Sequence, residues 1–346
     1  MTDVRAKVVE FDLHKHPDPE VKFLSIAKIK GKGWQCVVKT TDMKNARYGV
    51  YIPIDAEVPT THPMFAFLDK KGDGKPFRIK TIRLRQQLSQ GLLLPAPDGA
   101  KLGDDLTDEL GILRWEPTIP KHLAGDMVRE PGNFQKYTSI ENWKNFPDVF
   151  LEGDMVRITE KIHGTNCRFG FVDDGKVEGM TYFVGTHKTA RAKDGTNLYS
   201  EVSRNLRVEE KLQPLLKEFK PKQHLLVFGE IYGWNVQDLV YDCSKNQQHF
   251  RVFDVLIDHV YQPWSVIEKV AQALDVKTVP VLYRGPYNLG DTLRLRDGKT
   301  TLGEGHVREG VVVTSEPEEY HPEVGRKIIK FISDDYLLRK GGTDGH

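Results

Sequence analysis

The first 95 residues contain short β-prone segments that alternate with clusters of Gly, Pro and Asp. Residues 6–11, 34–38 and 48–52 are three such segments, each with several Val, Ile, aromatic or Cys side chains. Short strands with regular turn signals between them are typical of a small β barrel or sandwich. A chain of 346 residues is long enough for a second domain as well.

Composition changes between about 96 and 131, where Pro, Gly and Asp are frequent. We therefore predict an OB-like domain at 1–120, a linker at 121–131 and a second domain at 132–346. The second domain offers strand candidates at 182–184, 225–228, 251–255 and 310–313. An S-x-x-E capping box at Ser265 and Glu268, followed by apolar residues at helical spacing, predicts a helix that begins at Ser265.

The 50 Lys+Arg and 49 Asp+Glu leave a net charge of +1, which argues against a histone-like binder or an acidic disordered chain. Residues 70–85 differ from this average, because seven basic residues and one acidic residue give a local charge of +6. The apolar pattern of 77–85 changes phase, and a β-bulge near Lys80 and Thr81 would place four basic side chains on one face: Arg78, Lys80, Arg83 and Arg85.

This basic stretch has two interpretations. It is either an ordinary solvated face or a surface that contacts a nucleic-acid backbone. In the second case Trp34 and Tyr51 are candidate stacking groups, although either aromatic is equally compatible with the barrel core.

The three cysteines, Cys36, Cys167 and Cys243, are too far apart in sequence for a CxxC pair or a familiar zinc spacing. A disulfide framework is not expected, and a reducing compartment fits best. The N-terminus has no apolar signal region, and no stretch approaches the roughly 18 apolar residues of a membrane span. We expect a soluble cytoplasmic or otherwise intracellular protein that does not bind membranes.

Familiar phosphate and hydrolase motifs are absent. Residues 297–300 resemble the end of a Walker A motif, but position 293, where that motif needs glycine, is leucine. HExxH and GxSxG motifs do not occur.

A different pattern begins at Lys161, in the segment Glu-Lys-Ile-His-Gly-Thr-Asn that follows a predicted strand at 155–158. Alone, a lysine before a glycine turn is most often part of a surface loop. Further along, Glu230 ends an apolar strand, Phe253 lies in another, and Glu309 precedes Gly310. Two lysines follow, Lys327 and Lys330.

This order resembles the covalent nucleotidyltransferase superfamily of ATP-dependent ligases and capping enzymes. Its closest likeness is to template-directed, nick-sealing RNA ligases, which share Glu-Lys-x-His-Gly-Thr-Asn and a segment similar to 134–142. An OB-like domain before the transferase domain, with no extra domain after Lys330, resembles the fifth RNA ligase family. The resemblance implies an α+β fold: an N-terminal OB-like β barrel, then a nucleotidyltransferase domain with ATP-grasp-like antiparallel sheets and helices.

The resemblance also implies a role for each residue of the pattern. Lys161 is the nucleophile that attacks ATP. Lys327 and Lys330 are the cations that offset phosphate charge, and Lys330 is the better candidate for the α-phosphate, because i, i+3 spacing sends the two lysines to opposite faces of a strand. Glu309 holds Mg²⁺ or Mn²⁺, directly or through water.

The remaining residues would contact the nucleotide. The resemblance assigns Glu160 to the adenine amino group, Asn166 to phosphate or the water shell of the metal, Lys188 to phosphates and the RNA 5′ end, Glu230 to the ribose, and Phe253 to the adenine ring. Phe253 is also compatible with a place in the core. His163 stands where DNA ligases and capping enzymes have aspartate, and it shapes the turn or bonds a neighbouring group.

The expected activity is ATP-dependent RNA ligation, in which a lysyl-AMP intermediate adenylylates an RNA 5′-phosphate and a 3′-hydroxyl then displaces AMP. The expected partner is a nicked duplex with an RNA 3′-OH strand, bound by a monomer. Two other enzymes remain as alternatives, a DNA ligase and a GTP-using capping enzyme. A third alternative is a nucleic-acid end-binding protein with a degenerate transferase domain.

Overall fold

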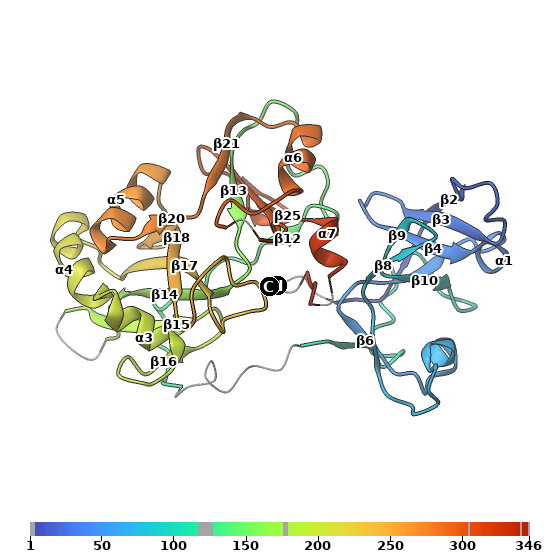
Figure 1. Cartoon of the computed structure of the whole chain (residues 1–346), viewed down its shortest axis with the longest axis horizontal. Helices are drawn as coiled ribbons and strands as arrows, with labels where there is room; N and C mark the ends of the chain where they lie inside the picture. Colours follow the sequence, from blue (N-terminus) through green and yellow to red (C-terminus); the bar gives the residue numbers. More distant parts are fainter. Residues whose placement is uncertain (1–3, 117–126, 176–178, 304, 340, 345–346) are drawn as a thin grey trace. The chain divides into compact units, whose positions relative to one another are not determined.

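The structure is a computed structural model that describes residues 4–116, 127–175, 179–303, 305–339 and 341–344. The chain divides into two compact units (Figure 1). The first comprises Met1–Pro117, Ile140–Phe150 and Ile329–His346, and the second comprises Thr118–Ser139 and Leu151–Ile328. Residues 121–126 of the predicted linker lie outside the described residues. No described helix is long and apolar enough to cross a membrane.

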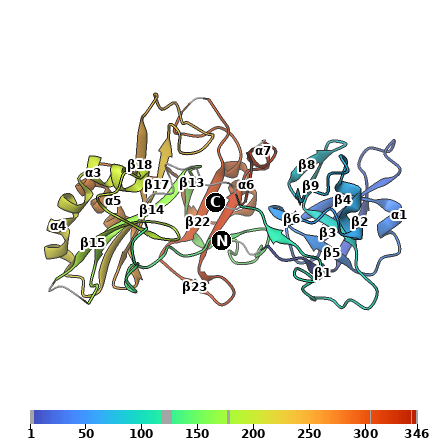
Figure 2. The same ribbon diagram turned by 90° about the horizontal axis from the view of Figure 1, so that it is seen from below.

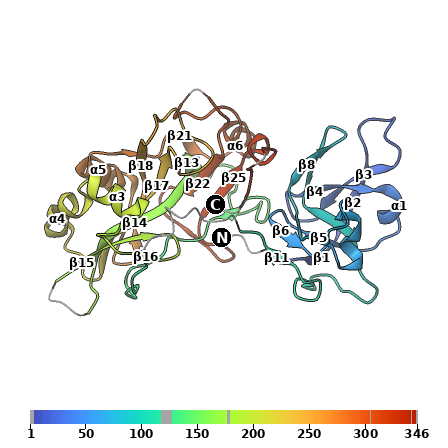
Figure 3. The same ribbon diagram turned by 60° about the horizontal axis from the view of Figure 1, so that its bottom comes forward.

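The first unit consists mainly of short antiparallel strands, as the pattern of its first 95 residues predicts (Figure 3). Its sheets pair β1 (Lys7–Val9), β5 (Gly49–Ile52) and β10 (Leu92–Pro95); β2 (Phe11–Lys15), β3 (Leu24–Ile29) and β4 (Gln35–Lys39); β8 (Thr81–Leu84) and β9 (Gln87–Gln90); and β11 (Leu113–Arg114), β6 (Ala56–Val58) and β7 (Phe77–Arg78). The short helices α1 (Thr40–Met43), η1 (Pro63–Leu68) and α7 (Asp334–Leu337) complete it, together with β12 (Glu141–Asn142), which pairs in parallel with β25 (Ile328–Ile332).

The core of this unit is formed largely by apolar residues of its strands, among them Val8, Val50 and Ile52. Trp34 and Tyr51 are buried, with 3% and 8% of their surface exposed. The Trp34 indole donates to Asn145 Oδ1 at 2.7 Å, and the Tyr51 hydroxyl donates to the Gln90 carbonyl at 2.9 Å. Both aromatics are therefore core residues, and their interpretation as base-stacking groups is wrong.

The expectation of one bulged basic strand at 77–85 is also wrong. Residues 77–78 form β7 and residues 81–84 form β8, which belong to different sheets. The chain breaks between them because Ile79 is buried and exchanges backbone hydrogen bonds with Asp55 and Ala56. Arg78 is consequently turned inward, where it pairs with Asp55 and lies 3.3 Å from the centre of the Trp115 ring. Arg83 and Arg85 remain exposed.

The second unit contains two mainly antiparallel sheets that carry the candidate site residues of this unit. In one sheet, β13 (Met155–Lys161) lies between β21 (Val281–Pro286) and β22 (Gly310–Ser315). The other runs β16 (Ala190–Arg191), β15 (Thr181–Thr186), β14 (Thr165–Val172), β17 (His224–Gly233), β18 (Gln248–Ile257) and β19 (Val260–Tyr261), with β20 (Lys277–Thr278) also on β18. A hairpin joins β23 (Tyr320–His321) and β24 (Gly325–Arg326).

Helices α3 (Leu198–Asn205), α4 (Val208–Phe219) and α5 (Trp264–Leu274) lie together along the second of these sheets (Figure 2), while α6 (Leu289–Arg296) lies near β22. The predicted helix at Ser265 is confirmed as α5, but its capping box is wrong. The helix begins one residue earlier, and Pro263 is its N-cap. Glu268 instead accepts a hydrogen bond from the Trp264 indole at 2.9 Å.

A buried ion pair stabilises the interior of the second unit. Arg326 and Asp254 are each 2% exposed at their side chains, and the Tyr137 hydroxyl donates to the same Asp254 oxygen at 2.9 Å. Burial and the nearby charge of Asp254 raise the pKa of Tyr137 well above its ordinary value, so the phenol remains a donor. Arg326 also pairs with Glu318.

Removal of one partner from this buried pair should destabilise the protein strongly, because an uncompensated charge would remain in the interior. We expect Asp254→Ala to lower the free energy of unfolding by about 3 kcal/mol, measured by urea denaturation. The matched control is Arg284→Ala, which removes a pair with Glu316 from a half-exposed arginine and should cost less than about 1 kcal/mol. Equal losses for the two variants would contradict this account.

Candidate active site

Lys161 and Glu309 form the centre of the candidate site. Lys161 is the last residue of β13 and pairs with Gly310 of β22, so Glu309 stands immediately before the neighbouring strand. Lys161 Nζ lies 2.6 Å from Glu309 Oε1. The side chains are 13% and 1% exposed, respectively. Antiparallel pairing thus joins two residues that are far apart in sequence into one charge pair.

Asn166 and Glu230 are directly opposite each other on the paired strands β14 and β17. The Glu230 carboxyl is desolvated, which raises its pKa from 4.5 to about 8; the charge of Glu309 adds to the rise, whereas Lys161 and the Gly164 backbone oppose it. Glu230 therefore belongs to the same electrostatic cluster as the Lys161–Glu309 pair.

Glu160 points to different partners from its neighbour Lys161. Its carboxylate is 2% exposed and accepts hydrogen bonds from the Thr300 hydroxyl and from both the backbone N–H and the hydroxyl of Thr301. Arg308 Nε lies 3.5 Å from the same carboxylate. Glu160 therefore ties the end of β13 to the segment before β22, and its role toward adenine stays a prediction.

The turn that follows Lys161 is held by residues that the sequence pattern did not identify. The His163 backbone N–H donates to the Tyr241 hydroxyl at 2.5 Å, and His163 Nε2 lies 2.8 Å from Asp238 Oδ1. Gln237 donates to the Gly164 carbonyl at 3.3 Å. These partners lie in the long connection between β17 and β18, which carries no recognisable motif.

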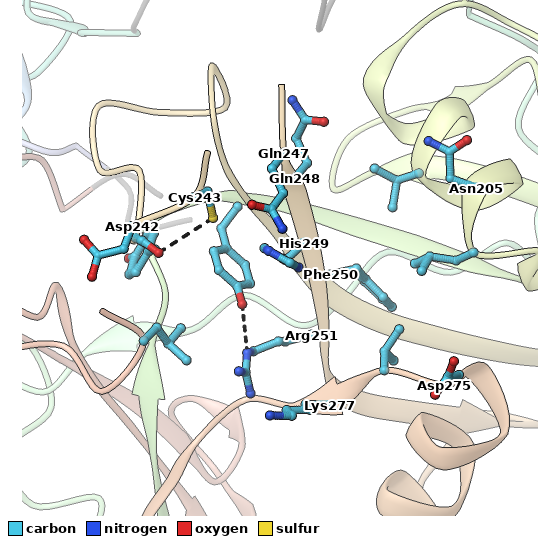
Figure 4. Close-up of a pocket in the computed structure, with 16 residues that line it drawn as sticks. Asn205, Asp242, Cys243, Gln247, Gln248, His249, Phe250, Arg251, Asp275 and Lys277 are labelled. Carbon is cyan, nitrogen blue, oxygen red and sulfur yellow. Dashed lines mark hydrogen bonds between the residues drawn. The ribbon is translucent and has the colours of Figure 1, made fainter. Parts of the chain in front are cut away.

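A cavity of about 570 Å³ lies beside these elements. Figure 4 shows Asp242 and Cys243 on the connection at one side, and Gln248, His249 and Arg251 along β18. Leu302, which follows the two threonines that bind Glu160, also lines it. The cavity therefore adjoins the elements that hold the lysine.

Two oxygen atoms, one on Glu309 of the charge pair and one on Asn166 opposite Glu230, are of the kind that binds a hard cation. Among the described residues, Glu309 Oε2 and Asn166 Oδ1 are buried without a hydrogen-bond partner. Buried polar atoms normally have partners, and carboxylate and amide oxygens are donors that Mg²⁺ and Mn²⁺ accept. No group of three His, Cys, Asp or Glu in the described part of the chain is arranged to hold a metal. An ion here would thus rely on these oxygens, water and phosphate.

The two candidate lysines near the end of the chain differ in their surroundings. Lys327 Nζ bonds Asp154 at 2.8 Å and Glu319 at 2.9 Å. Asp154 precedes β13 and Lys161 ends it, so a strand of seven residues, roughly 20 Å, separates Lys327 from the nucleophile candidate. Lys330 is 2% exposed in the first unit, where its ammonium lies 3.4 Å from Asp344 Oδ1.

Phe253 and Lys188 also have distinct surroundings. Phe253 lies at an irregularity of β18 and packs edge-on against Tyr137, with 4.9 Å between ring centres. Lys188 is exposed in the turn after β15, beside His187. Burial, the largest cause, and the positive charges of Arg168, Lys136 and Lys188 lower the pKa of His187.

Comparisons with known proteins show the family of the chain. The family model for RNA ligases matches residues 154–332, which is more than half of the chain, and a model for an OB-fold domain matches residues 14–96. The chain therefore belongs to the RNA ligase family, as its motifs predict. No curated protein matches it significantly.

Solved structures of an RNA ligase from Naegleria gruberi resemble the whole chain. A lysine-to-alanine mutant with ATP and Mn has a TM-score of 0.78 and 26% identity, and covers 96% of this chain and 98% of its own. The enzyme with pyrophosphate has the same TM-score and identity, with 97% and 98% coverage. The Naegleria structures thus contain ATP and Mn, the cofactors that the sequence predicts here. Their match and the observed mixed sheets and helices also confirm the predicted α+β fold class with an N-terminal OB-fold domain.

The raised pKa of Glu230 predicts a pH dependence of stability. Between about pH 4.5 and about pH 8 the folded protein binds this proton more tightly than the unfolded chain does, so stability falls as pH rises through that window. Urea denaturation should show wild type losing stability relative to Glu230→Gln between about pH 4.5 and about pH 8. An unchanged difference between the two proteins would show that Glu230 ionises normally.

Proposed function

We propose that this chain is an ATP-dependent RNA ligase that seals 3′-OH/5′-phosphate nicks in duplex nucleic acid through a lysyl-AMP intermediate. The observation that carries the proposal is the buried contact between Lys161 and Glu309 beside two unpartnered oxygens, in a chain of the RNA ligase family. This set of groups suits in-line displacement at phosphorus, which needs charge neutralisation and positioning more than acid–base catalysis.

In the first step, Lys161 Nζ attacks the α-phosphorus of ATP. A new N–P bond forms and the nitrogen releases a proton to solvent, while the bond from the α-phosphorus to the oxygen that bridges to the β-phosphate breaks and pyrophosphate leaves. The Glu309 carboxylate holds the lysine in the resting site, and attack requires the amine without its extra proton. Mg²⁺ or Mn²⁺ held by Glu309 and the Asn166 side chain would supply charge neutralisation on the phosphates. We assign Lys330 to the α-phosphate and Glu230 to the ribose.

The next two steps use the same kind of displacement. The RNA 5′-phosphate attacks the phosphorus of lysyl-AMP, the N–P bond breaks, and an adenylylated 5′ end forms. The 3′-hydroxyl then attacks the 5′-phosphate, loses its proton to solvent, and expels AMP as the strand is sealed. Lys188, an exposed cation in the turn after β15, suits the negatively charged 5′ end.

We further propose that different parts of the chain have separate functions. Residues 1–120 form the nucleic-acid-binding domain, 121–131 the linker and 132–346 the adenylyltransferase domain, and the protein acts as a monomer on a nicked duplex whose 3′-OH strand is RNA. The OB-fold match at 14–96 and the RNA ligase match at 154–332 support this division.

The nucleophile assignment predicts covalent labelling. Incubation of the full chain with α-labelled ATP and Mg²⁺ should transfer label to the protein, and Lys161→Ala should abolish the transfer because no other amine occupies its place. Lys193→Ala, which removes an exposed lysine paired with Glu209, should label like wild type. Undiminished labelling of Lys161→Ala would refute the assignment.

The exposed part of the basic stretch predicts a separate effect on RNA binding. Arg83→Glu with Arg85→Glu should weaken binding to a nicked duplex, while labelling by ATP is unchanged. The slope of the logarithm of the binding constant against the logarithm of salt concentration should become shallower by about one to two, because fewer counterions are released. Lys22→Glu with Lys44→Glu makes the same charge change on exposed residues outside the stretch. Equal losses of binding in both double variants would assign the effect to net charge alone.

A further inference from the structure

The connection between β17 and β18, residues 234–247, surrounds the turn that follows Lys161. It binds a backbone N–H, a backbone carbonyl and a side chain of that turn. The Tyr241 hydroxyl accepts a hydrogen bond from the His163 N–H, Gln237 donates to the Gly164 carbonyl, and Asp238 contacts the His163 ring. We call residues 234–247 the collar.

The collar is itself held in a demanding conformation. Tyr241 and Asp242 are consecutive residues with φ angles of 53° and 56°, a left-handed region that side chains other than glycine adopt at a cost. Such a conformation persists only where neighbouring groups fix it. The Tyr241 N–H donates to His306 Nε2 at 3.2 Å, and the two rings meet edge to face with 4.6 Å between centres.

A close approach on the other side adds to this fixation. A Cβ atom on Gly303 would lie 2.6 Å from Asp242 Oδ2 and 3.2 Å from the Tyr241 carbonyl carbon, so the segment 302–303 packs closely against the collar. That segment begins just after Thr301, which binds Glu160, the residue before the nucleophile. The collar is thus linked to Lys161 in two ways: directly through the turn that follows the lysine, and indirectly through Glu160, which precedes it.

The surroundings of Tyr241 keep its hydroxyl neutral. Tyr241 is 4% exposed, and burial together with the carboxylates Glu309, Glu160 and Glu230 raises its pKa well above the ordinary value, against the opposing effect of the His163 N–H. A neutral hydroxyl keeps its own hydrogen while it accepts the His163 N–H.

We propose that the collar is a positioning element for Lys161, and that the His163–Asp238 pair and the Tyr241 hydroxyl are the groups through which it acts. This inference rests on the proposed function. It also explains the histidine at position 163: its Nε2 makes a 2.8 Å contact with Asp238, whereas an aspartate there would be too short to make this contact and would bring a second negative charge toward Asp238. Residues 163 and 238 are therefore coupled, and each suits only a complementary partner.

The test measures single-turnover lysine adenylylation in the full chain over a range of ATP concentrations. The variants are His163→Asp, Asp238→His, their combination, and Tyr241→Phe. The control is Tyr182→Phe, which removes the hydroxyl of another buried tyrosine, bonded to Ser203 at 2.6 Å. Thermal unfolding of each protein separates loss of structure from loss of rate.

We expect His163→Asp to lower the maximal rate at least about tenfold, and the exchange of both residues to restore it to within about threefold. Tyr241→Phe should lower the maximal rate about 10- to 100-fold with little change in the ATP concentration that gives half of it, because misplacement of a nucleophile affects the reaction more than binding. Tyr182→Phe should react like wild type.

The collar proposal would be overturned if wild type were labelled normally while the double exchange failed to recover, or while Tyr241→Phe matched Tyr182→Phe. A wild-type protein that takes no label from ATP would instead refute the proposed function itself. The two failures are therefore distinguishable in one experiment.

Discussion

The register between β13 and β22 is the constraint on which the candidate site depends. Because Lys161 pairs with Gly310, the residue before that glycine, Glu309, contacts the lysine ammonium. A slip of one residue would turn every side chain of β13 to the opposite face of the sheet. The register is fixed along the whole strand, from the Val156–Ser315 pair to the Lys161–Gly310 pair, so the site depends on the sheet rather than on a flexible loop.

Two carboxylates, Glu309 and Glu230, interact with Lys161, and a third, Glu160, precedes it on β13; the surroundings of the three differ. Glu160 receives hydrogen bonds from Thr300 and Thr301, Glu309 contacts Lys161, and Glu230 is shifted toward its protonated form. Like charges in a desolvated site cannot all remain ionised without partners. This arrangement leaves one oxygen of Glu309 unpartnered, where a cation is most easily accepted.

The sequence predicts strand positions and motif order well, because period-2 patterns and short motifs are local. Contacts that depend on tertiary packing could not be predicted. Arg78 appears as part of a basic face in sequence, yet the break after β7 turns it toward Asp55. Tyr241 and Asp238 lie in a segment without a motif, and only the fold places them at His163. Lys327 fits the expected order, but Asp154 holds it at the far end of β13.

A pulse–chase measurement can decide whether Lys161 carries AMP to an RNA end. The protein would first be labelled with α-labelled ATP and freed of nucleotide, and then mixed with a nicked duplex whose strands at the nick are RNA. We expect the label to leave the protein, to appear on the RNA 5′ end, and to be released as AMP while the strand is sealed. Label that stays on the protein while the nick remains open would contradict it.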